Sequence, residues 1–192
     1  MQPDDSFYIA PAVETGRPDN SSNRLPKEIR VYDLLDKLDI AYKRLDHDPT
    51  ATVESCHDID KILGVEICKN LFLRNTQKTS FYLLLIPGNK KFKTAVLSKQ
   101  IGSARLSFAE AEYMEEILDI TPGSVSVLGL MNDKEHKVKL LIDQDVLTKE
   151  YFGCHPCINT SSLKIRTSDL IERILPAINY DYTLVELPYV EI

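Results

Sequence analysis

Two short segments carry the side chains with the greatest chemical potential. In Lys69-Asn70-Leu71-Phe72-Leu73-Arg74, a lysine and an asparagine stand at the start of an apolar, alternating stretch. In Gly153-Cys154-His155-Pro156, a histidine lies in a turn bounded by glycine, which permits close backbone approach, and proline, which fixes the exit. Taken singly, Lys69 is best interpreted as a strand-end residue that reaches solvent, and His155 as a structural residue. Such a turn can also aim an imidazole into a pocket.

The segment Cys154-His155-Pro156-Cys157 is a C-x-x-C, a spacing that redox couples and zinc knuckles use. A redox pair opens a helix, whereas residues 158–165 favour loop and strand. A structural zinc site needs four ligands, and the remaining cysteines, Cys56 and Cys68, are isolated. We therefore expect reduced, buried and inert thiols, with no metal and no cofactor.

Familiar catalytic signatures are missing from the sequence. It contains no G-x-S-x-G, P-loop, dinucleotide-binding or H-E-x-x-H motif, so an enzyme with a covalent nucleophile is unsupported. His47, His57 and His136 have no obvious partner along the chain.

Composition indicates an ordinary globular protein. Of the 192 residues, 43% are hydrophobic and 27% are charged, and no apolar run approaches the ~20 residues of a membrane span. The polar start predicts no secretory signal, and hence a soluble cytoplasmic protein without membrane contact. The net charge of −6 argues against non-specific wrapping of nucleic acid. A local basic patch could still guide an RNA end, although a solvated face is the simpler interpretation; its members would be Lys90, Lys91, Lys93 and Lys99.

The elements that must position these residues follow from hydrophobic periodicity. Residues 1–26 are rich in Pro, Asp, Ser and Asn and predict an arm that is poorly ordered, with Phe7, Tyr8 and Ile9 available to dock. Residues 27–192 predict one domain. Helices are expected after Pro26 to Leu38, over 58–63 with Gly64 as the stop, over 93–101, from a capping box at 107–110 to Leu118, and over 167–175 before Pro176. Strands are expected over 42–45, 69–74, 81–86, 138–143, 163–166 and 182–185. Because the two types intermix without strict alternation, the fold class is α/β with a mixed sheet.

A series of short motifs in a fixed order resembles a known family. The chain is similar over residues 27–175 to the YbaK or prolyl-tRNA-synthetase-associated editing domains, and within them to freestanding prolyl-tRNA editing proteins. The motifs are Tyr32-Asp33-Leu34-Leu35, Asp46-His47, Cys68-Lys69-Asn70-Leu71-Phe72-Leu73, Arg105-Leu106-Ser107-Phe108-Ala109, Thr121-Pro122-Gly123-Ser124-Val125-Ser126, Gly129-Leu130-Met131-Asn132-Asp133 and Gly153-Cys154-His155-Pro156-Cys157-Ile158-Asn159-Thr160.

The resemblance implies a mixed, partly barrel-like sheet flanked by helices, and hydrolysis of alanine mischarged onto proline tRNA. A synthetase pocket cannot exclude the smaller alanine, because a missing methylene is worth only ~1–3 kcal/mol. By the same resemblance Lys69 and His155 are catalytic residues without a metal, and Lys69 stabilises charge at the ester or binds the RNA 3′ end. The substrate-binding residues that it implies are Asn70, Gly129, Leu130, Met131, Asn132, Gly153 and Pro156.

Two alternatives remain open. The same fold could deacylate another small residue, such as Cys- or Ser-tRNA, or it could be a non-catalytic regulator that binds tRNA or a synthetase. The implied partner is the acceptor end of an aminoacylated proline tRNA. Because the chain is acidic, affinity must come from the local basic patch or from association with prolyl-tRNA synthetase or an elongation factor.

Overall fold

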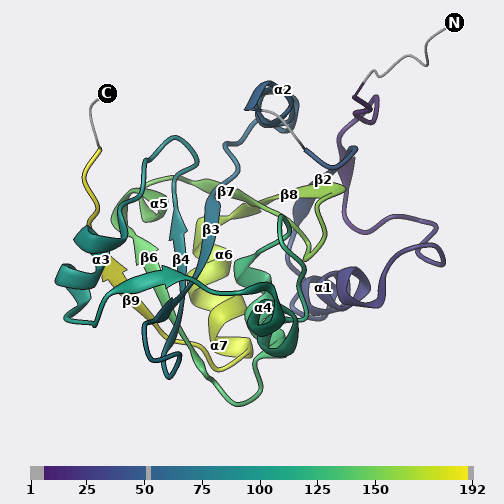
Figure 1. Ribbon diagram of the computed structural model, residues 1–192. Coiled ribbons are helices and arrows are strands. Elements are labelled where there is room, and N and C mark those ends of the chain that lie inside the picture. Colours follow the sequence, from purple (N-terminus) through teal and green to yellow (C-terminus); the bar gives the residue numbers. More distant parts are fainter. Residues whose placement is uncertain (1–6, 51–52, 190–192) are drawn as a thin grey trace, which may run out of the picture.

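The larger of two β-sheets is mixed and has five strands. The computed structural model describes residues 7–50 and 53–189. The strand order in this sheet is β5 (Leu106–Phe108), β3 (Lys69–Asn75), β4 (Phe81–Ile86), β6 (Val138–Asp143) and β9 (Tyr182–Val185) (Figure 1). β3 is antiparallel to β4 and β5, whereas β6 is parallel to β4 and β9. Every residue of β4 is buried, as its uninterrupted apolar sequence predicts for a central strand.

The second sheet is antiparallel and has four strands. Its order is β1 (Glu14–Thr15), β2 (Tyr42–Asp46), β8 (Ser161–Arg166) and β7 (Tyr151–Cys154). An isolated parallel bridge between Ile67 and Gly153 connects the start of β3 to β7. The expected mixed α/β fold is therefore confirmed, with two sheets that adjoin without closing into a barrel.

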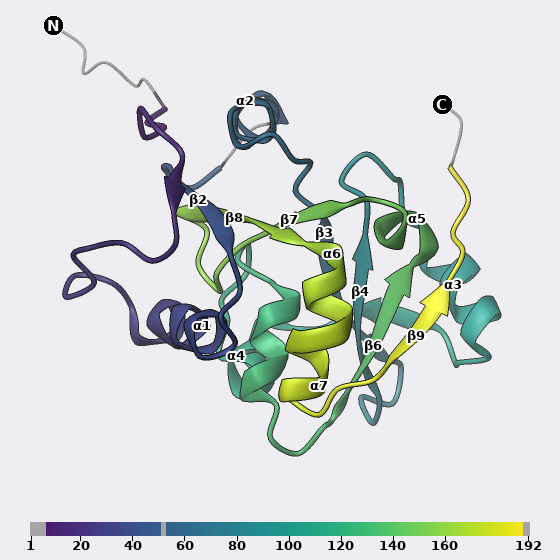
Figure 2. The same ribbon diagram turned by 180° about the vertical axis from the view of Figure 1, so that it is seen from behind.

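Helices cover both sheets. They are α1 (Pro26–Lys37), α2 (Val53–Leu63), α3 (Thr94–Ile101), α4 (Ala111–Leu118), α5 (Gln144–Leu147), α6 (Thr167–Asp169), a π-helical turn (Leu170–Ile174) and α7 (Leu175–Ala177), with a 3₁₀ helix over Val127–Asn132. The main core joins apolar residues of α1, α4, the 3₁₀ helix and the C-terminal helix to the inner faces of both sheets (Figure 2). A second cluster packs α3 against the other face of the five-stranded sheet, and a third packs α2 against β2.

One predicted helix start is wrong. Ser107 does not cap a helix, because it lies in β5 opposite Arg74 of β3. The helix begins at Ala111 after Glu110, whose side chain makes no capping hydrogen bond. Glu110 instead pairs with Arg74 at 2.7 Å. The long-range pairing of β5 with β3 thus displaces a local signal in the sequence.

Two other predicted boundaries also differ. Pro176 does not end the last helix but lies inside α7, where the preceding π-helical turn has already altered the hydrogen-bond pattern. Gly153 and Cys154 belong to β7 rather than to a turn, and the turn begins at His155.

The described part of the N-terminal arm lies against the four-stranded sheet. Glu14 and Thr15 pair with β2, Ile9 bridges to His47, and the ring of Phe7 stacks on that of His47 at 6.4 Å. Residues 1–6 lie outside the described residues, so the predicted poor order of that segment stays a prediction. Within residues 7–50 and 53–189, no helix is long and apolar enough to cross a membrane.

Candidate functional site

The bridge between the sheets brings Lys69 and His155 to one place. Ile67 pairs with Gly153 in parallel, and the Cys68 N–H donates to the Gly153 carbonyl at 2.9 Å. Lys69 and His155 each follow this bridge by two residues in the same direction. Because side chains alternate along a strand, Lys69 lies on the face of β3 opposite Cys68 and Asn70, which pack with the main core. The structure therefore places the two predicted catalytic residues at the same end of the sheet junction.

Glycine is required at position 153 by the closeness of the two chains. A Cβ there would lie 2.6 Å from Ile67 Cδ1 and 3.0 Å from the Glu66 carbonyl oxygen. A side chain would force the start of β3 away from β7. Gly153 therefore sets the spacing between the segments that carry Lys69 and His155.

Lys69 is exposed, and one of its three donors is already engaged. Its Nζ donates to the carbonyl oxygen of Lys90 at 2.9 Å, which ties the lysine to the loop between β4 and α3. Glu66 accepts from the Asn89 N–H of the same loop at 2.6 Å. This loop therefore forms one wall beside Lys69.

The predicted basic patch is wrong at Lys90. Its side chain is 1% exposed, and its ammonium lies 2.8 Å from Asp143 and 2.9 Å from Asp145. We call these three residues the ion-pair cluster. Burial alone would lower the pKa of Lys90, but the hydrogen bonds that its ammonium donates to the two aspartates outweigh burial and raise the pKa above its usual value. Three lysines of the predicted patch remain exposed, namely Lys91, Lys93 and Lys99.

His155 belongs to a second cluster, at the end of the four-stranded sheet. Its Nδ1 lies 2.9 Å from the Ser161 carbonyl oxygen and 3.4 Å from Ser162 Oγ. Ser162 Oγ in turn lies 2.8 Å from His47 Nε2, and His47 Nδ1 lies 2.8 Å from the Asp48 carbonyl oxygen. We call His47, Ser162 and His155 the histidine cluster.

These contacts fix which nitrogen of each ring carries the proton. A carbonyl oxygen can only accept, so Nδ1 of both His47 and His155 must be protonated. His47 Nε2 then accepts from the Ser162 hydroxyl. His155 Nε2 has no hydrogen-bond partner among the described residues, and in the neutral ring it carries a lone pair.

Both imidazoles are held in the neutral form. Burial lowers the pKa of His155, an effect that His47 reinforces and the Ser161 carbonyl opposes. Burial also lowers the pKa of His47, against the opposing effects of the Asp48 carbonyl and the charges of Asp46 and Asp48. At neutral pH the His155 ring is therefore a hydrogen-bond acceptor at Nε2.

Asn70 faces the main core rather than the side of Lys69. Its Oδ1 accepts from the Val127 N–H at 2.8 Å, and its Nδ2 donates to the Cys68 carbonyl at 3.2 Å. The predicted pocket wall at Gly129, Leu130 and Met131 is likewise buried in the core, within the 3₁₀ helix. That stretch therefore does not form an exposed wall.

The other predicted binding residues are also occupied by the fold. Asn132 Nδ2 donates to the Leu118 carbonyl at 2.9 Å, and Pro156 is buried. The 3₁₀ helix, which includes Asn132, is hydrogen-bonded to Asn70 of β3 through Val127. Pro156 directly follows His155 in the chain, and Gly153 lies two residues before it.

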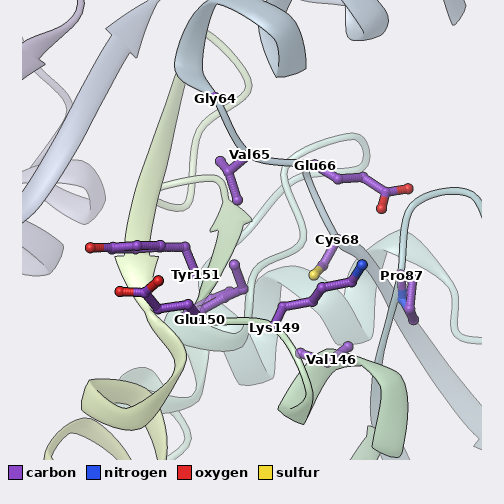
Figure 3. Close-up of a pocket in the computed structure, with 10 residues that line it drawn as sticks. Gly64, Val65, Glu66, Cys68, Pro87, Val146, Lys149, Glu150 and Tyr151 are labelled. Carbon is purple, nitrogen blue, oxygen red and sulfur yellow. The ribbon is translucent and has the colours of Figure 1, made fainter.

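A cavity of about 280 Å³ opens beside the sheet junction. Figure 3 shows the Cys68 thiol and the Lys149 side chain within it. We call it the junction cavity, and its lining is Gly64, Val65, Glu66, Cys68, Pro87, Val146, Lys149, Glu150, Tyr151 and Phe152. Lys69 and Gly153 are the chain neighbours of two of these residues. The cavity thus adjoins the site without being lined by Lys69 or His155.

The cysteines are not equipped as nucleophiles. Burial raises the pKa of Cys68 and of Cys157 to about 12, and it raises the pKa of Cys154 as well. All three are free thiols and stay protonated at neutral pH. No group of three or more His, Cys, Asp or Glu in the described ranges is arranged to hold a metal ion.

Comparison with known proteins places this geometry in a family. A family model described as the aminoacyl-tRNA editing domain matches residues 47–172. The chain belongs to the aminoacyl-tRNA editing domain family. The matched segment begins at His47 and includes Lys69, His155 and Ser162.

Individual relatives agree with this assignment. The chain is 34% identical over 154 residues to the prolyl-tRNA editing protein ProX of Acetoanaerobium sticklandii, with 80% of this chain and 93% of the relative covered. It is 26% identical over 170 residues to prolyl-tRNA synthetase associated domain-containing protein 1 of Danio rerio, covering 88% and 91%. The solved structure of the hypothetical protein APE2540 superposes with a TM-score of 0.60 at 18% identity, covering 76% of this chain and 92% of that one, which shows a shared fold.

Two members of the histidine cluster were not predicted from the sequence. His47 was part of a recognised motif but had no visible partner, and Ser162 carried no signal. Ser162 lies 115 residues from His47, and only the pairing of β2 with β8 brings them together.

Proposed function

We propose that this protein is a trans-editing deacylase that hydrolyses alanine mischarged onto proline tRNA, in the cytoplasm and without a cofactor. The observation that carries the proposal is the joint position of Lys69 and His155 beyond the Ile67–Gly153 bridge in a chain of the editing-domain family. The name of the relative at 34% identity, a prolyl-tRNA editing protein, supports proline tRNA as the RNA.

The proposed reaction is attack of water on the ester carbonyl, with release of the free amino acid and the terminal ribose hydroxyl. Lys69 keeps two N–H donors after its bond to the Lys90 carbonyl, and these stabilise negative charge on the ester oxygen or on the terminal phosphate. His155 Nε2 accepts a hydrogen bond from a donor on the aminoacyl-adenosine end. Asn70 supports the site indirectly, because its oxygen holds the 3₁₀ helix on the core side of β3.

Specificity would follow from size. The junction cavity of about 280 Å³ lies at the small end of ligand pockets, which favours a small aminoacyl group. Exclusion of proline then needs only a rigid wall close to the ester. Lys91 and Lys93 would guide the acceptor end, and prolyl-tRNA synthetase or an elongation factor would deliver it.

The first test is deacylation of Ala-tRNA(Pro) beside Pro-tRNA(Pro), Cys-tRNA(Pro) and Ala-tRNA(Ala). We expect rapid loss of alanine from proline tRNA and retention of proline. Faster loss of cysteine would favour the alternative of another small mischarged residue. Binding of charged tRNA without hydrolysis of any substrate would favour a regulator and contradict the proposal.

Lys69→Ala tests the assignment of the lysine. We expect kcat to fall about 100-fold or more, the scale of one lost donor to a developing oxyanion. Lys91→Ala is the matched control, because it removes an exposed lysine of the neighbouring loop and should change KM more than kcat. Equal kcat in Lys69→Ala and the unmodified protein would remove Lys69 from the mechanism.

A further inference from the structure

The structure contains a buried polar chain that the proposed reaction does not itself require. His47 is 3% exposed and Ser162 is fully buried, and neither residue lines the junction cavity. Burying polar groups is unfavourable unless each is hydrogen-bonded, and here each is. The chain runs from the Asp48 carbonyl through His47 and Ser162 to the Nδ1 side of His155.

The direction of the hydrogens in this chain is determined from its far end. The Asp48 carbonyl accepts a hydrogen bond from Nδ1–H of His47, which leaves His47 Nε2 as an acceptor 2.8 Å from Ser162 Oγ. The Ser162 hydroxyl must therefore point its hydrogen at His47. Its lone pairs are then left for His155, whose Nδ1–H also donates to the Ser161 carbonyl.

We propose that His47 is a positioning residue for His155, acting through Ser162 to keep the His155 ring in the Nδ1–H form with Nε2 free for the substrate. If His47 were absent, the Ser162 hydroxyl could turn and donate to His155 Nδ1. That arrangement would favour the opposite form, with the proton on Nε2, which cannot accept a hydrogen bond. The expected change in kcat rests on the proposed function, whereas the expected protonation of the His155 ring does not.

The environment of the chain fits this role. The Phe7 ring stacks on His47, and the Tyr8 backbone exchanges hydrogen bonds with Asp48, so the arm packs against His47. The charged groups that face His47 are Asp46 and Asp48, and Asp46 is already paired with Arg24 and Arg44. The His47 and His155 rings lie 6.2 Å apart, so a charge on either ring disfavours a charge on the other.

The test compares variants that cut the chain with one that preserves it. Ser162→Ala removes the link and His47→Leu removes the acceptor, whereas His47→Gln retains an oxygen able to accept at the position of Nε2. We expect His47→Leu to lower kcat about tenfold with little change in KM, the scale of one lost hydrogen bond. Ser162→Ala should lower kcat less, because it leaves no hydroxyl that could donate to His155 Nδ1. His47→Gln should recover most of the activity. His57→Gln, which changes an exposed histidine of α2, should have no effect.

Two readouts separate positioning from general structural damage. Nitrogen-15 spectra of the imidazoles should show His155 protonated at Nδ1 in the unmodified protein. Protonation of Nε2 should rise in His47→Leu, where the Ser162 hydroxyl can donate to Nδ1, and not in Ser162→Ala, where the Ser161 carbonyl remains as the acceptor. In His47→Leu the acidic limb of kcat/KM against pH should also move to higher pH, because the influence of His47 on the pKa of His155 is lost. Because His47→Leu acts through the Ser162 hydroxyl, the double variant His47→Leu/Ser162→Ala should show only the smaller loss of Ser162→Ala.

The outcomes are distinct from those of the proposed function. If the unmodified protein hydrolyses no aminoacyl-tRNA, the proposed function fails, but the spectra of the protein alone still decide the role of His47. Protonation of His155 at Nε2 in the unmodified protein would overturn the inference. So would loss of activity in folded His47→Leu with an unchanged pH profile and unchanged spectra.

Discussion

Lys69 and His155 are held in place by two chemically different supports. Lys69 donates to the main chain of Lys90, whose side chain is fixed by two carboxylates in the ion-pair cluster. His155 is fixed by a carbonyl and by the neutral histidine cluster. Lys90 stays charged across the neutral range because its pKa is raised, whereas the histidine cluster depends on two rings that take up protons in acid, at a pKa below the usual value. One side of the same site is therefore insensitive to moderate pH change, and the other is not.

The largest expected loss of stability follows from breaking the ion-pair cluster. Lys90→Met leaves Asp143, which is fully buried, without its cation, and should lower the free energy of unfolding by about 3–5 kcal/mol. Urea denaturation monitored by circular dichroism would measure it. Lys93→Met, at an exposed position of the same segment, should change stability by about 0.5 kcal/mol or less. A loss in Lys90→Met as small as that of the control would show that the cluster does not hold this loop.

The next effect distinguishes the two clusters by pH. The pKa values of His47 and His155 are lowered in the folded protein, so the unfolded chain binds more protons below about pH 6.5. The free energy of unfolding should therefore fall as pH drops from 7.5 to 5. Lys90 has a raised pKa, so its contribution is complete below about pH 10.4 and is lost above it.

Urea denaturation at several pH values would show which residues cause the loss of stability in acid. The double variant His47→Gln/His155→Gln should lose much of the acidic slope, whereas His57→Gln should keep it. An acidic slope that survives unchanged in the double variant would assign it to the carboxylates. Asp46 is one candidate, because hydrogen bonds from Arg24 and Arg44 outweigh its burial and lower its pKa to about 2.

The smallest effect concerns the arm that covers the histidine cluster. Phe7→Ala removes the ring stacked on His47 and should lower the free energy of unfolding by about 1 kcal/mol. Tyr8→Ala is the control, because its side chain is 54% exposed and its contacts with Asp48 are made by the backbone. Equal effects of the two substitutions would mean that the stack on His47 contributes nothing specific.

Local patterns predicted the elements around Lys69 better than their surroundings. The apolar runs of β3 and β4 and the glycine after α2 are visible over a few residues, and the structure agrees with them. Ser107 failed as a cap because its pairing partner, Arg74, lies in a strand far along the chain. A local signal can be overridden when a longer-range pairing satisfies the same backbone groups.

The same reasoning explains the errors at the site. The positions of Lys69 and His155 followed from family motifs, but the burial of Lys90 depends on Asp143, which is 53 residues away. A lysine in a polar turn is normally solvated, so no sequence pattern could distinguish this one from Lys91. His47 and Ser162 likewise become neighbours only through the register of β2 with β8.

The place of β2 in its sheet has a consequence for how this protein can be divided. The family match starts at residue 47, whereas β2 ends at Asp46 and lies between β1 and β8. A fragment cut at the start of the match would leave β8 with an unpaired edge and would lose the α1 residues Val31, Tyr32 and Leu35 from the main core. An open, apolar strand edge invites self-association. The smallest soluble unit of this protein should therefore begin before β1, well upstream of the segment that identifies its family.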